Sequence, residues 1–223
     1  EEAKIAGAPT ASRWEYPLMD EGRRCFAGFL ANQQPEDVLS GFYEKVLSGT
    51  VWMQPIDPRS QEPIPRKTAW MVTGNCTCSY RYGGVDVEPQ QFPGWMHELL
   101  EVYMPLCGIN SRNNWPNSCN LNLYKDGGMS VGWHADDEKL FGGKKTDIRI
   151  ISLSLGCTRT FELRLAASDV EEDRGRCSMK LAAGDLCTME GLTQKYYQHR
   201  VPKEDASGAR LNLTWRWITN SAP

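Results

Sequence analysis

The two stretches that decide the fold are CNLNLYKDGGMSVGWH, residues 119–134, and RLNLTWRWI, residues 210–218. In both, polar and apolar residues alternate with a period of two, which is typical of strands that bury one face. A turn rich in glycine and aspartate divides the first stretch into two such runs. This pattern predicts that the C-terminal half of the chain is built from short strands.

Runs of the same kind continue between these two stretches. The expected strands are 119–124, 130–134, 149–155, 160–165, 178–181, 185–189, 198–201 and 210–218. Because no helical pattern separates them, they favour a double-sheet jelly roll, the double-stranded β-helix. The charged stretch 166–176 is expected to be a solvent-exposed hairpin loop.

Two earlier stretches have helical periodicity. Apolar residues recur at helical spacing in 35–48 and 94–104, and proline or glycine brackets each stretch. Both are expected to be amphipathic helices that face a core. Residues 52–89 are rich in proline, glycine and threonine and are expected to form irregular strands and loops. The predicted fold class is therefore mainly β (α+β).

Length and charge bound the possibilities. The chain has 223 residues, 40% of them hydrophobic, and a formal net charge of −3. A single soluble domain is expected, since all-β domains reach this length. Its expected parts are an N-terminal helical buttress (1–64), a substrate lid with a supporting helix (65–118) and the jelly-roll core (119–220). The acidic balance means that any nucleic-acid site must be a local patch.

No secretory signal is visible at the start, and no apolar run approaches the roughly 20 residues that span a bilayer. We therefore expect an intracellular monomer, in the nucleus or cytoplasm, that does not bind membranes. The eight cysteines are irregularly spaced and are expected to be reduced thiols. A zinc site formed by Cys76, Cys78, Cys107 and Cys119 is an alternative, although its first pair is closer than the usual spacing.

Two of the three histidines suggest a metal centre. In His134-Ala-Asp136 the two side chains leave the same face of an extended strand, so one ion could contact both. His199 could supply a third ligand from a distant strand. Two imidazoles and one carboxylate form the facial arrangement of non-haem Fe(II) oxygenases. Taken alone this pattern is weak, because such spacing often occurs by chance.

The last predicted strand carries Arg210 and Arg216 on its polar face. That face is either solvated, as on an edge strand, or directed into a polar cavity. Near a metal, such arginines would suit a dicarboxylate, because a guanidinium pairs bidentately with carboxylate and keeps its charge. Residues 120–124 also gather their polar groups on one face, and their Asn and Tyr side chains could bind the same anion.

At this point a family resemblance is evident. The segment NLYKDGGMSVGWHADDE, residues 122–138, resembles the AlkB-family signature of Asn-x-Tyr, a spacer and His-x-Asp-Asp-Glu. Later segments agree in order and spacing: SLSLGCTRTF (152–161), GDL (184–186), MEGLTQ (189–194), HRVPK (199–203) and RLNLTWR (210–216). The residues in these segments most resemble those of animal AlkB homologues that act on single-stranded nucleic acid.

The resemblance implies Fe(II) bound by His134, Asp136 and His199. It also implies 2-oxoglutarate, with O2 as cosubstrate, held by Asn122, Tyr124, Arg210, Asn212 and Arg216, where Arg210 pairs with the distal carboxylate. The implied reaction demethylates N-alkylated bases such as 1-methyladenine or 3-methylcytosine in single-stranded DNA or RNA. Its products would be formaldehyde, succinate and CO2.

Residues 65–70, PRKTAW, and 79–84, SYRYGG, are similar to the nucleotide-recognition lid of the family. Basic residues between aromatic ones suit an extruded base and its phosphates. The candidate substrate contacts are Arg66, Trp70, Tyr80, Tyr82, Asp137, Glu138 and Arg159. Packing residues on a hairpin, for the tyrosines, and a solvated acidic turn, for the carboxylates, are the competing interpretations.

Two other functions stay open from the sequence. One is an oxygenase that uses the same iron chemistry on a protein or a small molecule, in which case the lid tyrosines would matter little. The other is a non-catalytic reader of modified RNA. The complete set of metal and anion ligands argues against a reader, which would have no need of them.

Overall fold

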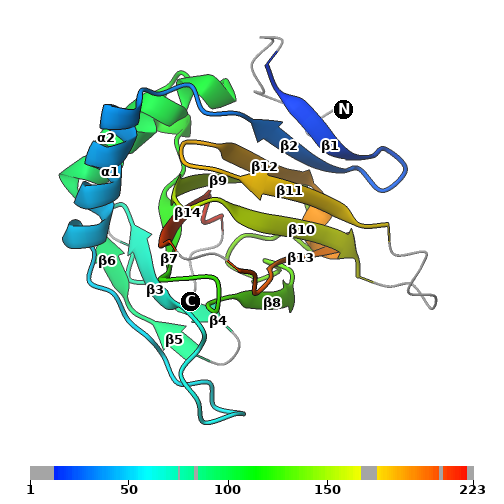
Figure 1. Cartoon of the computed structure of the whole chain (residues 1–223). Coiled ribbons are helices and arrows are strands. Elements are labelled where there is room, and N and C mark those ends of the chain that lie inside the picture. The colour runs from blue at the N-terminus through cyan, green and yellow to red at the C-terminus, as the bar shows by residue number, and fades with distance from the viewer. Residues whose placement is uncertain (1–12, 75, 83–84, 167–174, 206–207, 220–223) are drawn as a thin grey trace.

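The structure is a computed structural model that describes residues 13–74, 76–82, 85–166, 175–205 and 208–219. It consists of two main β-sheets, with two helices against the larger one (Figure 1). Within these ranges no helix is both long enough and apolar enough to cross a membrane.

The larger sheet has eight strands. In order across the sheet they are β1 (Glu15–Asp20), β2 (Cys25–Leu30), β12 (Leu186–Gly191), β9 (Ile148–Gly156), β14 (Arg210–Arg216), β7 (Ser118–Tyr124), β3 (Lys67–Val72) and β6 (Pro89–Gln91). Neighbouring strands are antiparallel except for β3 and β6, which pair in parallel.

The smaller sheet has four strands, in the order β11 (Cys177–Leu181), β10 (Arg159–Leu165), β13 (Tyr197–Val201) and β8 (Val131–His134). A separate hairpin pairs β4 (Tyr80–Tyr82) with β5 (Val85–Val87). Buried apolar side chains from both main sheets, among them Phe161, Leu163 and Ile150, form one cluster. The chain is therefore a jelly roll, as the sequence predicted.

The helices α1 (Glu36–Gly49) and α2 (Gly94–Tyr103) cover the outer face of the larger sheet. Their apolar sides join the outward side chains of β14, Leu211, Leu213 and Trp215, which are fully buried. Burial of each such side chain is worth about 1.5–3 kcal/mol. Three short helical turns complete the described elements: η1 (Pro105–Cys107), η2 (Arg112–Asn114) and α3 (Thr193–Tyr196). The polar sides of β7 and β14 are thereby directed inward.

All eight predicted strands and both predicted helices are present, with ends within two residues of the prediction. The N-terminal segment differs from the prediction of a helical buttress. Within its described residues, 13–64, the strands β1 and β2 come before α1, the one helix there. Five of the six residues of β2 are buried. Its sequence, CFAGFL, is apolar on both faces, so the period-two signal was missing. Most of the expected loop at 166–176, residues 167–174, lies outside the described residues.

The cysteines differ from the expectation in one place. Cys76 and Cys78 form a disulfide, whereas the other six cysteines are free thiols, as expected. Cys107 and Cys119 are fully buried between the helices and the larger sheet. Since the first pair is bonded to itself and the second is packed in the core, the alternative of a zinc site formed by these four residues is wrong.

Candidate metal centre and cosubstrate cavity

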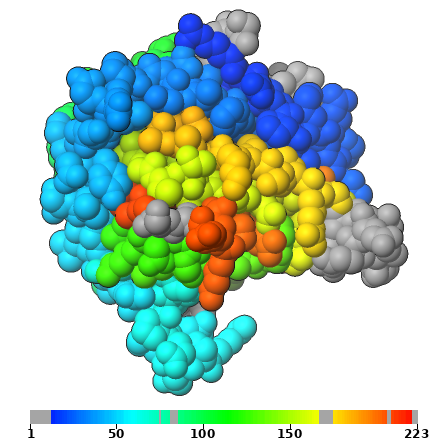
Figure 2. Space-filling view, in the orientation of Figure 1, coloured from blue at the N-terminus to red at the C-terminus, as the bar shows by residue number. Residues whose placement is uncertain are grey.

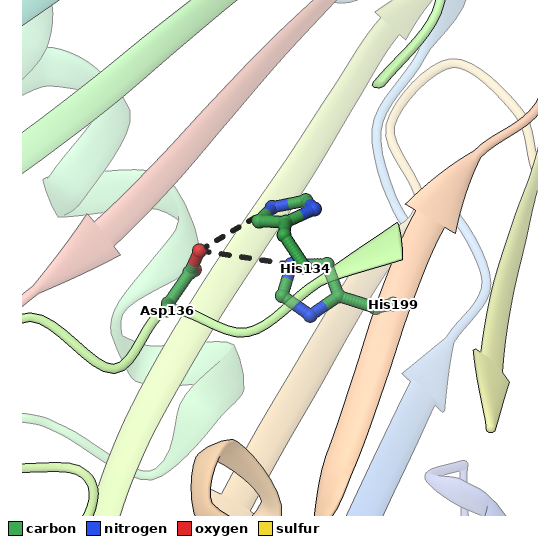
Figure 3. Close-up of side chains that lie close together, drawn as sticks. All are labelled: His134, Asp136 and His199. Atoms are coloured by element: carbon green, nitrogen blue, oxygen red, sulfur yellow. Dashed lines mark ion pairs between the residues drawn. The ribbon is translucent and has the colours of Figure 1, made fainter. Parts of the chain in front are cut away.

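Three side chains able to bind one metal ion meet where β8 and β13 lie side by side (Figure 3). One possible ligand atom from each of His134, Asp136 and His199 lies within 4.8 Å of the others. The register of the two strands sets His134 opposite His199. Opposed residues of an antiparallel pair are close neighbours, and the two ring centres lie 4.2 Å apart. The pairing of β8 with β13 thus brings together two histidines that are 65 positions apart in the sequence.

Asp136 faces both imidazoles and one arginine. Its Oδ1 lies 3.5 Å from Nε2 of His134 and 3.7 Å from Nε2 of His199. Its Oδ2 accepts a hydrogen bond from Nη2 of Arg216. Burial alone would raise the pKa of Asp136, but Arg216 and then the histidines hold it well below its usual range. The carboxylate therefore stays ionised, as a ligand of a divalent cation must.

Each histidine can offer a ring nitrogen to a metal. Burial, and then the charge of His134, lowers the pKa of His199 to about 3, so its ring is uncharged at neutral pH. Nδ1 of His134 lies 2.8 Å from the carbonyl oxygen of Gly132. A carbonyl can only accept, so Nδ1 carries the proton and the lone pair of Nε2 is available to a metal.

A cavity joins these ligands to the inward polar faces of the larger sheet. Its walls include the triad and, from β7, β9 and β14, Asn122, Tyr124, Ser152, Asn212, Thr214 and Arg216. Alternate residues of a strand point to the same face, which is why the Asn-x-Tyr pattern of β7 and the Asn-x-Thr-x-Arg pattern of β14 converge on one space. Both polar faces that the sequence indicated are therefore directed into a cavity.

Arg210 has unused hydrogen-bonding capacity in the interior. It is 1% exposed, and its Nη2 donates to Oγ of Ser154 at 2.9 Å. Its guanidinium lies 5.5 Å from the ring centre of Tyr124, while Nε and Nη1 have no hydrogen-bond partner among the described residues. Burial lowers the pKa of Arg210. A buried cation left partly unpaired is costly, so this site fits an anionic ligand such as a carboxylate.

The structure places the two other predicted arginines in the interior. Arg66, expected at the substrate, lines the same cavity as the triad, and its Nε donates to Oδ1 of Asn122 at 2.9 Å. Arg159, expected at a phosphate, is buried and bonds Glu204 at 2.8 Å. Its remaining donors reach the backbone carbonyls of Asp126, Met129 and Pro202. Arg159 thus connects the loops that carry these four partners.

The lid residues form a packed wall beside the triad. Tyr80 is 2% exposed and stacks on buried Trp70, with ring centres 4.9 Å apart. The Tyr80 hydroxyl donates to Oε1 of Glu138 at 2.6 Å. Burial, and then the charge of Asp136, raises the pKa of Glu138. This arrangement corresponds to the packing interpretation for Tyr80.

The other two lid candidates are less defined. Tyr82 lies in the same strand, but its side chain is outside the described part of the structure. Asp137 is half-buried and pairs with Lys144, with 2.5 Å between Oδ2 and Nζ.

Two supporting contacts were not anticipated. The backbone N–H of Asp136 donates to Oε1 of Gln194 at 2.9 Å, which fixes the loop after β8. Nδ2 of Asn212 donates to Oγ of Ser152 at 2.6 Å. Gln194 ends the MEGLTQ segment quoted above, so the segment was recognised without a role for this residue. The serines alternate along β9, which was the available signal for an inward polar face.

The chain has recognisable relatives. A family model described as the 2OG-Fe(II) oxygenase superfamily matches residues 22–216. The rat alpha-ketoglutarate-dependent dioxygenase alkB homolog 3 is 34% identical over 202 residues, which are 86% of this chain and 63% of that protein. The human protein of that name is 39% identical over 161 residues, 69% of this chain and 52% of that protein.

A third relative, the DNA oxidative demethylase ALKBH2 of Arabidopsis thaliana, is 32% identical over 176 residues, which are 69% of this chain and 53% of that protein. The chain thus spans less than two thirds of the length of these relatives. Among solved structures, that of OsALKBH1 covers 91% of this chain and 100% of its own, with a TM-score of 0.59 and 16% identity. That likeness shows the shared fold alone.

Proposed function

Since the chain belongs to the 2OG-Fe(II) oxygenase superfamily, we propose that it is an Fe(II)- and 2-oxoglutarate-dependent demethylase of N-alkylated nucleobases. The expected substrates are 1-methyladenine or 3-methylcytosine in single-stranded DNA or RNA. The observation that carries this proposal is the buried triad of His134, Asp136 and His199, which opens into one cavity with the polar faces of β7 and β14.

His134, Asp136 and His199 would hold the iron, with two imidazoles and one ionised carboxylate as ligands. The bound iron supplies the oxidation of an N-methyl group by O2, coupled to decarboxylation of 2-oxoglutarate. Arg216 keeps Asp136 ionised and fixes its second oxygen. Gln194 holds the backbone of the same residue. The protein thereby presets the carboxylate before any metal enters.

Asn122, Tyr124, Asn212 and the two strand arginines would hold 2-oxoglutarate. Arg210 is the residue suited to the distal carboxylate, because its Nε and Nη1 are buried and lack partners among the described residues. Arg216 lies at the opposite end of the same strand face and contacts Asp136. A dicarboxylate could therefore be held from the metal toward Arg210. Ser154 orients the guanidinium through Nη2.

The substrate base would approach the triad beside the wall formed by Tyr80, Trp70 and Glu138. The Tyr80 hydroxyl fixes Glu138, and burial, then the charge of Asp136, raises the pKa of its carboxyl. A protonated carboxyl could donate a hydrogen bond to a base, whereas an ionised one could pair with a cationic methylated ring. The name of the ALKBH2 relative, a DNA oxidative demethylase, supports a nucleic-acid substrate. Such a substrate would agree with an intracellular monomer in the nucleus or cytoplasm, which stays a prediction.

The reaction to be tested converts the N-methyl base, 2-oxoglutarate and O2 into the unmethylated base, formaldehyde, succinate and CO2. One oxygen atom of O2 enters succinate, and the other enters the hydroxymethyl group that leaves as formaldehyde. The protein, loaded with Fe(II) and 2-oxoglutarate without oxygen, is exposed to air with methylated single- and double-stranded oligonucleotides. Mass spectrometry should detect loss of one methyl group on single strands.

Two variants serve as controls for this experiment. His134→Ala should abolish the loss, because it removes a metal ligand. Arg112→Ala, at an exposed residue on the helical side of the molecule, should leave the loss unchanged. Succinate formation without loss of a methyl group from any oligonucleotide would keep the oxygenase chemistry and move the substrate to a protein or a small molecule.

A further inference from the structure

An aromatic ring between two arginines lies on the outer face of the smaller sheet. The guanidinium carbon of Arg164 is 4.3 Å from the ring centre of Trp133, and that of Arg200 is 4.5 Å from it. We call these three residues the Arg-Trp-Arg stack. They come from β10, β8 and β13, three adjacent strands of that sheet. Nothing in the catalytic proposal above uses them.

The stack lies directly behind the candidate metal ligands. Trp133 precedes His134 and Arg200 follows His199, and successive side chains of a strand point to opposite faces. Arg164 follows Leu163, which pairs with His199 across β10 and β13. The two histidines therefore face the interior, while the stack occupies the other side of the same strand segments.

Hydrogen bonds hold both guanidinium groups in place. Arg164 donates from Nε and Nη2 to Oε1 of Gln198, at 3.2 and 3.0 Å. Arg200 donates from Nε to Oε2 of Glu162 at 2.5 Å, and its side chain remains 31% exposed. Gln198 orients Arg164 without adding a negative charge.

The metal centre is partly exposed at the edge of the smaller sheet. The side chain of His134 is 21% exposed, against 7% for His199 and 3% for Asp136. β8 is an edge strand. Gly132, within it, is exposed and has open space within 4 Å of where a Cβ would stand. A strand of nucleic acid whose base enters past His134 would therefore cross β8 beside Trp133.

We propose that the Arg-Trp-Arg stack binds the backbone phosphates next to the base in the metal cavity. This inference rests on the proposed function. Guanidinium groups pair with phosphate in a fork-like geometry, and an aromatic face holds them in orientation. The chain has a net charge of −3, so affinity for a polyanion requires such a local cationic site. In the space-filling view this part of the chain, yellow to orange, reaches the surface between the blue N-terminal strands and the cyan segment after α1 (Figure 2).

Salt-dependent binding tests this proposal without any catalysis. Fluorescence anisotropy would measure the affinity of an unmethylated single-stranded oligonucleotide at several salt concentrations, for the wild type and for Arg164→Gln and Arg200→Gln. Each lost phosphate contact should lower the slope of log K against log salt by about 0.7. The matched control is Arg112→Gln, since Arg112 is 73% exposed and lies 5.4 Å from the ring centre of Trp115 on the helical side.

The expected result is a lower slope for both stack variants and an unchanged slope for Arg112→Gln. Arg200→Lys, which keeps the charge, should retain most of the slope and excludes a folding defect as the cause. Wild-type slopes in both stack variants would overturn the proposal and leave the stack as a brace for β8. Equal losses in all three glutamine variants would also overturn it. Demethylation by the wild type, measured separately, decides the proposed function independently of these slopes.

Discussion

Replacing Arg210 with methionine should remove most of the affinity for 2-oxoglutarate while leaving the fold and the metal site intact. Arg210 is 1% exposed, and Nε and Nη1 have no hydrogen-bond partner among the described residues. Methionine keeps an unbranched side chain and removes the charge. None of the described hydrogen bonds or ion pairs joins Arg210 to the triad, so metal affinity should stay unchanged.

The size of the effect follows from the two unused donors. A hydrogen bond to a charged group contributes about 1.5–3 kcal/mol, and an arginine fork can make two of them to one carboxylate. Their loss should weaken 2-oxoglutarate binding by about 3–6 kcal/mol, which is roughly a hundredfold to ten-thousandfold. The protein without ligand should not lose stability, because methionine removes a partly unpaired buried cation.

Calorimetry on the Mn(II)-loaded protein without oxygen measures this affinity directly. Arg149→Met is the matched control, since Arg149 is another largely buried arginine but donates to the backbone of Cys107, on the outer side of the larger sheet. Its variant should bind 2-oxoglutarate as the wild type does. A loss of less than about tenfold in Arg210→Met would refute the assignment of the distal carboxylate to Arg210.

Three further outcomes are expected. Asp136→Asn should weaken Mn(II) binding, read by calorimetry, by more than the roughly 100-fold that loss of an outer-shell contact can cost. Burial opposes ionisation of Glu204, but its bonds with Thr160 lower its pKa from 4.5 to about 2. The stabilisation from this lowered pKa is present above pH 4.5 and is lost as the pH falls toward 2. Glu204→Gln should therefore lower the free energy of unfolding, measured by urea titration, by about 2–3 kcal/mol at pH 7 and by little near pH 2. Tyr80→Phe, which removes the bond to Glu138 but keeps the stacked ring, should cost about 1 kcal/mol in the same assay.

Local alternation was enough to predict the jelly roll but not its full extent. The strands around Asn122 and Asn212 are buried throughout, but one face of each is polar and borders the cavity, so their period-two pattern was visible. β2 is enclosed by β1 and β12 and is apolar on both faces. Its sequence, CFAGFL, therefore carries no periodic signal, and only the completed sheet shows where it belongs.

The arginines mark the limit of prediction for the site. Arg159 and Arg210 both stand in alternating strands, and both are 1% exposed. Arg159 is satisfied by Glu204 and three backbone carbonyls, whereas two nitrogens of Arg210 lack partners among the described residues. Hydrogen bonds to backbone carbonyls cannot be predicted from residue types. The sequence pattern alone therefore could not distinguish an arginine with a structural role from one suited to bind a ligand.

The triad was more accessible to prediction, because His134 and Asp136 are two residues apart and share one side of the chain. Pairing with His199 depended on the register of β8 and β13, which the sequence does not state. The lid was harder still. Tyr80 follows a pattern suited to base stacking, yet it packs on Trp70 because the neighbouring apolar residues enclose it.

The central claim is that this site couples 2-oxoglutarate oxidation to removal of a methyl group from a base. The most direct measurement counts succinate and formaldehyde produced from an oligonucleotide that carries a single 1-methyladenine or 3-methylcytosine, with the His134→Ala variant alongside. The wild type should produce equal amounts of succinate and formaldehyde, and His134→Ala should produce neither. Absence of both products from the Fe(II)-loaded wild type, or formaldehyde that persists in His134→Ala, would contradict the claim.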